Sequence, residues 1–96
     1  MTQAKPSQLK IDSIISSYTN GEFQHALDEA SKLIIDFPED AFLFNITGAC
    51  YQGLGDLDSA VESFVRAIDI NSDYAKAHYN LAGTLFELGR LDESIK

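Results

Sequence analysis

Residues 41–74 read AFLFNITGACYQGLGDLDSAVESFVRAIDINSDY, and this stretch contains two helical patterns separated by a glycine turn. In each half, bulky and small residues recur at spacings of three and four, which places them on one face of a helix. These residues are Phe44, Gly48 and Tyr51 in the first half, and Ala60, Phe64 and Ala67 in the second. Leu54-Gly55 separates the halves, because glycine readily adopts the left-handed conformation that ends a helix. The stretch therefore predicts two antiparallel helices, in which Gly48 and Ala60 allow a close approach of about 8–10 Å.

The same pattern recurs 34 residues away on both sides of this hairpin. Leu88-Gly89 lies 34 positions after Leu54-Gly55, and Asn20-Gly21 lies 34 positions before it. Residues 75–82 align with residues 41–48 without a gap. A single amphipathic hairpin cannot bury both of its faces, so the repetition predicts that neighbouring hairpins stack on one another.

This repetition resembles the tetratricopeptide repeat family, whose unit is a helix-turn-helix of about 34 residues. The signature positions coincide with the helix faces described above, although Thr47 replaces the usual leucine and Ser72 stands where a closing proline is common. The resemblance implies an all-α fold, a right-handed helix-turn-helix repeat array (an α-solenoid) with two full repeats and a partial third. The expected boundaries are a polar tail over residues 1–6 and a repeat domain over residues 7–96, divided into repeats 7–40, 41–74 and 75–96.

The first helices can be placed from their turns and caps. Helices are expected over residues 7–19 and 23–35, with a turn at Gly21 between them. We expect the third helix to start at Phe37-Pro38, because proline is tolerated at the first position of a helix.

The last repeat is expected to be incomplete. After a fifth helix over residues 75–88, Gly89-Arg90 predicts a turn, and Leu91 begins a sixth helix that stops at Lys96. The apolar side of the fifth helix consists of Leu81, Leu85 and Leu88. Six residues cannot cover that side, and repeat arrays usually end in a polar capping element. We therefore expect either a fragment of a longer array or a chain that covers its open end by self-association.

Composition limits the possible classes of protein. Ninety-six residues with 45% apolar content predict one compact unit. No apolar run approaches the roughly 18 residues of a membrane span, and the first ten residues lack the apolar core of a secretory signal. A single cysteine fits a reducing compartment, so we expect a cytoplasmic protein without a membrane partner.

The net charge of −8 argues against nucleic acid as a partner, because phosphate binding requires clustered lysine and arginine and the chain has only seven, scattered along it. Many of the acidic residues lie in or beside the first turn of an expected helix, where they cap it or offset its dipole. They are Glu22, Glu39, Asp40, Asp56, Asp58, Asp73, Asp92 and Glu93. The charge is therefore interpreted mainly as a solvated surface, and the alternative is that it selects a basic partner.

The resemblance also implies a binding surface, because the first helix of each repeat in this family faces the concave side of the array. An extended peptide would be held there through its backbone amides and through one or two apolar side chains. The predicted peptide-binding residues are Tyr18, Phe42, Asn45, Gln52, Lys76, Tyr79, Asn80 and Phe86. Ala49 and Gly83 would form a small-residue floor between them. Two alternatives remain open: these aromatic residues could fill gaps between repeats, or the same surface could mediate self-association.

No catalytic or metal-binding pattern is predicted. His25 and His78 lie on different expected helices, and His78 is expected to be a partly buried packing residue. Cys50 is expected to be an inert buried thiol, because no basic group is predicted beside it. These three residues lack the spacing of metal ligands, and no cofactor is expected.

The function predicted from these features is a non-catalytic protein–protein interaction module that binds a peptide or protein segment on its concave face. One alternative is an N-terminal recognition arm of a larger enzyme, such as a transferase. Another is a self-assembling scaffold, with homo-oligomers formed through the uncovered C-terminal repeat.

Overall fold

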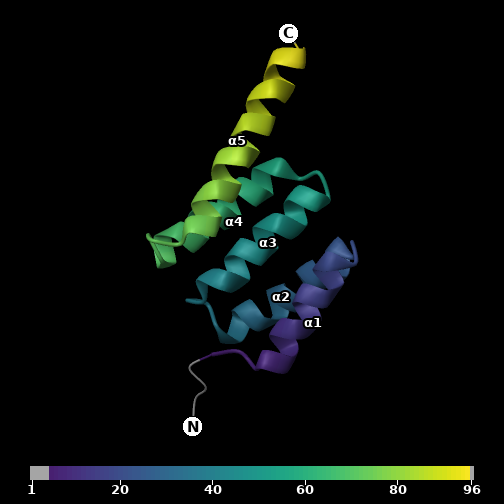
Figure 1. Ribbon diagram of the computed structural model, residues 1–96, viewed down its shortest axis with the longest axis vertical. Helices are drawn as coiled ribbons and strands as arrows, with labels where there is room; N and C mark the ends of the chain where they lie inside the picture. The colour runs from purple at the N-terminus through teal and green to yellow at the C-terminus, as the bar shows by residue number, and fades with distance from the viewer. Residues whose placement is uncertain (1–4, 96) are drawn as a thin grey trace.

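The computed structural model describes the backbone of residues 5–95 and the side chains of residues 5–90, and it contains five helices in this range (Figure 1). They are α1 (Gln8–Thr19), α2 (Phe23–Asp36), α3 (Ala41–Gly53), α4 (Leu57–Ile70) and α5 (Ala75–Ile95). No strand occurs between residues 5 and 95, so the all-α prediction is confirmed. Within that range, no helix combines the length and the apolar composition needed to cross a membrane.

The helices are arranged as two hairpins and a single helix, stacked in chain order along an elongated molecule of 55 × 28 × 19 Å. The first helix of each pair, α1 and α3, lies in one layer together with α5, and α2 and α4 lie behind them (Figure 1). Helix α3 packs against α2, α4 and α5, whereas α1 packs mainly against α2. The predicted helix-turn-helix array is therefore present, with α5 as the start of its third unit.

Aspartate side chains fix the starts of α3 and α4. Asp40 Oδ1 accepts a hydrogen bond from the Leu43 amide, and Asp56 Oδ1 accepts one from the Ser59 amide, each at 3.2 Å. Such caps satisfy amide groups that have no partner within the helix. The prediction that α3 starts at Phe37-Pro38 was wrong, because Phe37 still closes α2 through a bond from its amide to the Leu33 carbonyl and Asp40 sets the start.

Two glycines end the first helices of the hairpins as predicted. Gly21 has a φ of 80° and Gly55 a φ of 85°, in the left-handed region that other residues adopt at a cost. The predicted turn at Gly89 and the separate sixth helix were wrong, because α5 continues without a break to Ile95. A glycine permits a turn but does not impose one. Because α5 continues through Gly89, it keeps its ladder of backbone hydrogen bonds.

The core of the second hairpin is closely packed around Phe64. Ala60, Phe64 and Ala67 are completely buried, as their spacing predicted. A Cβ atom added to Gly48 would lie 2.5 Å from Phe64 Cε1, so only glycine allows this contact. Thr47, which stands where the family prefers leucine, is buried, and its hydroxyl donates to the Leu43 carbonyl at 2.7 Å. The hydroxyl is therefore satisfied inside its own helix.

Candidate protein-binding face

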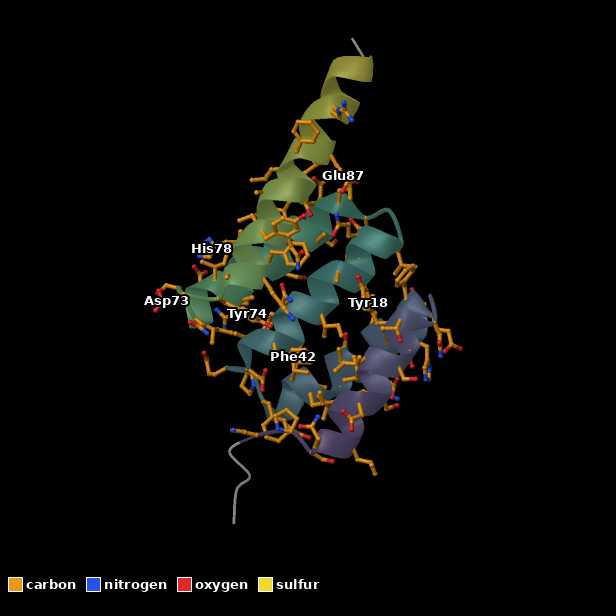
Figure 2. All side chains as sticks on the ribbon, in the orientation of Figure 1. Tyr18, Phe42, Asp73, Tyr74, His78 and Glu87 are labelled. Atoms are coloured by element: carbon orange, nitrogen blue, oxygen red, sulfur yellow. The ribbon has the colours of Figure 1, made fainter. Side chains whose placement is uncertain are left out.

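The predicted binding residues lie on α1, α3 and α5, which form one layer. Their side chains differ in how much of their surface is buried by packing against other helices. Tyr18 lies toward the carboxyl end of α3, and Phe42 lies at its amino end (Figure 2). Both side chains are half-buried and pack on the hydrophobic core of the first two hairpins. The Tyr18 ring also meets the Phe23 ring, with centroids 5.5 Å apart. These two aromatics therefore present only part of their surface.

Polar side chains join α3 to α5. Asn80 Nδ2 donates to Asn45 Oδ1 at 3.2 Å, and Gln52 Nε2 donates to Glu87 Oε1 at 2.7 Å. We call these four residues the polar seam. Asn45 is only 8% exposed, so its side-chain amide mainly stabilises the contact between α3 and α5 and is little accessible to a ligand. The structure thus pairs Asn45 with Asn80 and Gln52 with Glu87, a structural role that the sequence did not indicate.

Tyr74 lies beside the polar seam, just before α5 (Figure 2). Burial raises the pKa of its hydroxyl, contact with the Asn45 amide lowers it again, and the negative charge of Asp40 raises it. The phenol therefore stays neutral well above neutral pH. Tyr74 and Asn45 together close the amino end of the α3–α5 contact.

The most exposed aromatic residues lie on one side of α5. Tyr79 is 81% and Phe86 63% exposed, and their separation of seven residues places them two turns apart, about 10 Å along the helix. Gly83 lies between them with open space above its Cα, and exposed Lys76 lies one turn before Tyr79. We call Lys76, Tyr79, Gly83 and Phe86 the aromatic stripe. The Arg90 guanidinium lies 4.9 Å from the Phe86 ring centroid and supports this ring from one side.

The remaining chemistry-bearing residues have structural partners. His78 is exposed, so its expected partial burial was wrong; its Nε2 atom lies 2.8 Å from the Ser72 carbonyl. His25 contacts Glu29 at 3.3 Å. Cys50 is fully buried as predicted, and burial raises the pKa of its thiol to about 11. Among the described residues, no three histidine, cysteine or acidic side chains are placed to hold a metal ion.

Three residues of this region were missed by the sequence reasoning. Glu87 belongs to the polar seam and Tyr74 lies beside it, and the Arg66 guanidinium lies 5.6 Å from the Phe44 ring centroid on the α3–α4 hairpin. The sequence does contain a regularity that relates to the polar seam. Both of its hydrogen bonds join residues 35 positions apart, one more than the repeat length. That offset reflects the stagger of neighbouring helices and becomes readable only once their packing is known.

The arrangement of stacked helical hairpins defines the chain as an α-helical repeat protein. The sequence pattern of the TPR repeat matches residues 49–89. Over residues 49–89 the chain is therefore similar to the tetratricopeptide repeat family.

Three curated proteins illustrate its similarity. The chain is 26% identical over 98 aligned residues to a peroxisomal targeting signal receptor of Candida albicans, an alignment that includes 96% of this chain. It is 30% identical over 63 residues to anaphase-promoting complex subunit 3 of Dictyostelium discoideum, which includes 62% of the chain. It is 38% identical over 50 residues to tetratricopeptide repeat protein 16 of Homo sapiens, which includes 52% of the chain.

The chain spans only a small part of these relatives, 17% of the first and 6% of each of the other two. What they share with it is the helical repeat.

Proposed function

We propose that the chain is a non-catalytic module that binds an extended segment of a partner protein on the face formed by α1, α3 and α5. The observation that carries this proposal is the aromatic stripe. Large aromatic side chains exposed to this degree are enriched in surfaces that bind proteins, where they contribute a disproportionate share of the binding energy. Tyr79 and Phe86 flank Gly83, so a chain can approach the α5 backbone between the two rings.

The polar groups next to the stripe fit a peptide backbone. Asn80 and Gln52 are half-buried, and each uses one hydrogen-bonding atom in the polar seam. A primary amide carries two donors and one acceptor, so both side chains retain capacity for a ligand. Lys76, exposed at the start of the stripe, would attract an acidic group of the segment. Tyr18 and Phe42 would contribute their exposed edges on the side of α3.

The relatives make a protein ligand the more reasonable choice. One is named as a receptor for a peroxisomal targeting signal and another as a subunit of the anaphase-promoting complex. The first name describes a receptor and the second a member of a complex, and neither names a chemical reaction. The proposal takes from them only this general role.

The test uses peptides selected from a random phage-displayed library on the immobilised chain. We expect Tyr79→Ala combined with Phe86→Ala to weaken the selected peptides about 30-fold, because truncating such aromatics costs about 2 kcal/mol or more. Leu9→Ala combined with Ile35→Ala is the matched control, because these residues are 81% and 79% exposed and belong to neither the aromatic stripe nor the polar seam. Unchanged affinity of the first variant, with intact helicity, would show that the face is assigned wrongly.

A second candidate is self-association through α5. Leu85 is 51% exposed on the same helix as Tyr79 and Phe86, so α5 offers an apolar surface to a second copy of the chain. Light scattering over a wide concentration range tests this candidate. A mass that stays at that of one chain throughout would exclude it.

A further inference from the structure

A hollow remains between α1 and α2, on residues that the proposed binding face does not use. It has a volume of about 280 Å³ and is lined by Lys10, Ile14, Glu29, Lys32, Leu33 and Asp36. We call it the α1–α2 slot. Ile14 and Leu33 are buried and form an apolar floor, whereas Lys10, Lys32 and Asp36 are exposed and form a charged rim. The slot therefore has a buried floor and opens to solvent at its rim.

The second hairpin shows what normally fills this place. Thirty-four residues after Lys10 stands Phe44, and thirty-four after Lys32 stands Arg66. The Phe44 ring is half-buried between α3 and α4, with the Arg66 guanidinium 5.6 Å from its centroid. In the first hairpin, Lys32 keeps the positive charge found at Arg66, but Lys10 stands in place of the aromatic residue Phe44. The α1–α2 slot is thus the position of a missing aromatic ring.

The size and charge of the slot fit such a ring with a carboxylate beside it. A cavity of about 150 Å³ is enough to bind benzene, so the α1–α2 slot has room for one aromatic side chain. Glu29 is already occupied, because it accepts from Ser13 at 2.8 Å and from Ser17 at 3.1 Å. The ion pairs among the described residues involve His25 and Arg66, so both lysines of the rim are without a carboxylate partner there.

We propose that the α1–α2 slot is a second docking site, which receives one aromatic side chain of a partner protein flanked by an acidic residue. The ring would rest on Ile14 and Leu33. Lys32 would lie over its face as Arg66 lies over Phe44, and Lys10 would pair with the neighbouring carboxylate. Lys10 and Lys32 supply two positive charges beside the Asp36 carboxylate at this rim, on a chain with a net charge of −8.

The test uses two probes and nuclear magnetic resonance of the whole chain. The first probe is 3-phenylpropionate, and the second is the blocked peptide acetyl-Asp-Phe-Asp-amide. Both are expected to shift amide signals of α1 and α2 saturably at millimolar concentration, and acetyl-Asp-Leu-Asp-amide and 3-phenylpropanamide are expected to bind more weakly. Binding of 3-phenylpropionate without binding of the peptide would overturn the assignment to a protein partner.

Filling the slot from within gives the decisive variant. Lys10→Phe restores the residue found in the second hairpin, so it should abolish probe binding and raise the midpoint of thermal unfolding. Ser16→Phe places the same ring on an exposed position of α1 outside the slot, and it should leave binding unchanged. Lys32→Gln, at an exposed position, is expected to weaken binding about three-fold.

The proposal fails if Lys10→Phe remains folded and still binds the probes with native affinity, or if native protein shows no saturable shift in α1 and α2. If Lys10→Phe does not fold, Lys32→Gln decides, and unchanged affinity there also refutes the slot. Tyr79→Ala with Phe86→Ala should leave these shifts intact. Failure of the proposed binding face and failure of this site are therefore distinguishable.

Discussion

The contact between Gly48 and Phe64 makes a quantitative prediction about stability. Replacing Gly48 by alanine adds a Cβ atom 2.5, 2.7 and 2.9 Å from three atoms of the Phe64 ring. Phe64 is completely buried, so the ring cannot move away without disturbing its neighbours. Overpacking of this kind costs about 1–3 kcal/mol. Alanine inside a helix gains about 1 kcal/mol over glycine, so the expected net loss is about 1 kcal/mol.

Gly83 provides the matched control for this prediction. It also lies inside a helix, but nothing lies within 4 Å of the Cβ atom that alanine would add. Gly83→Ala should therefore keep the full gain of about 1 kcal/mol from helix propensity. The two substitutions are chemically identical, and they are expected to change stability in opposite directions.

Thermal unfolding followed by circular dichroism measures this difference. For a domain of this size, 1 kcal/mol corresponds to a shift in midpoint of about 4–8 °C, downward for Gly48→Ala and upward for Gly83→Ala. Urea unfolding of the same variants supplies the free energies. Equal stabilisation by both substitutions would refute the reasoning, because it would mean that α3 and α4 do not approach each other through Gly48.

Three further predictions concern the turns, the thiol and the polar seam. Gly55→Ala should destabilise by about 1–2 kcal/mol because of its positive φ, whereas Gly89→Ala should stabilise slightly because Gly89 lies inside α5; chemical denaturation measures both. Cys50 should resist a thiol-reactive probe at pH 8 until the chain unfolds, and because its pKa is raised in the fold, stability should fall as the pH rises from about 9 to 11. Asn80→Ala leaves the buried Asn45 amide without that partner and should cost about 1–3 kcal/mol, whereas Gln52→Ala, whose bond to Glu87 is exposed, should cost less than about 1 kcal/mol by urea unfolding.

Much of the fold was predictable because the same helix and turn pattern recurs every 34 residues in the sequence. The buried face of Ala60, Phe64 and Ala67 and the turns at Gly21 and Gly55 follow from spacing and from the freedom of glycine alone. Local chemistry was also sufficient for the cap at Asp56. These features depend on residues close together in the chain.

The errors arose where the outcome depends on what packs against a segment. Leu88-Gly89 repeats Leu54-Gly55, yet the chain turns at Gly55, where α4 packs Phe64 and Ala67 into the hairpin core, and α5 runs straight through Gly89. His78 occupies a packing position of the pattern, but its ring remains exposed and bonds to the Ser72 carbonyl. A position in a repeat predicts which helix face carries a residue. It does not predict whether neighbouring residues bury its side chain.

The candidate site was predictable only in part for the same reason. The sequence placed Tyr79 and Phe86 on the layer of first helices, and both side chains are exposed there. It did not predict that Asn45 would be buried by its bond to Asn80, because that bond depends on the stagger between α3 and α5. The α1–α2 slot was also missed, although Lys10 stands visibly at the place of Phe44 in the next repeat.

The central position of α3 has a consequence for how the molecule opens. This helix is covered on three sides, by α2, α4 and α5, whereas α1 is held mainly by α2. In a linear array each unit is stabilised by its neighbours, so local opening should begin at the outer helices and move inward. Backbone amides of α3 and α4 should then exchange with deuterium most slowly, and those of α1 and the distal part of α5 most quickly. The α3–α4 hairpin would be the last cooperative unit to lose its structure.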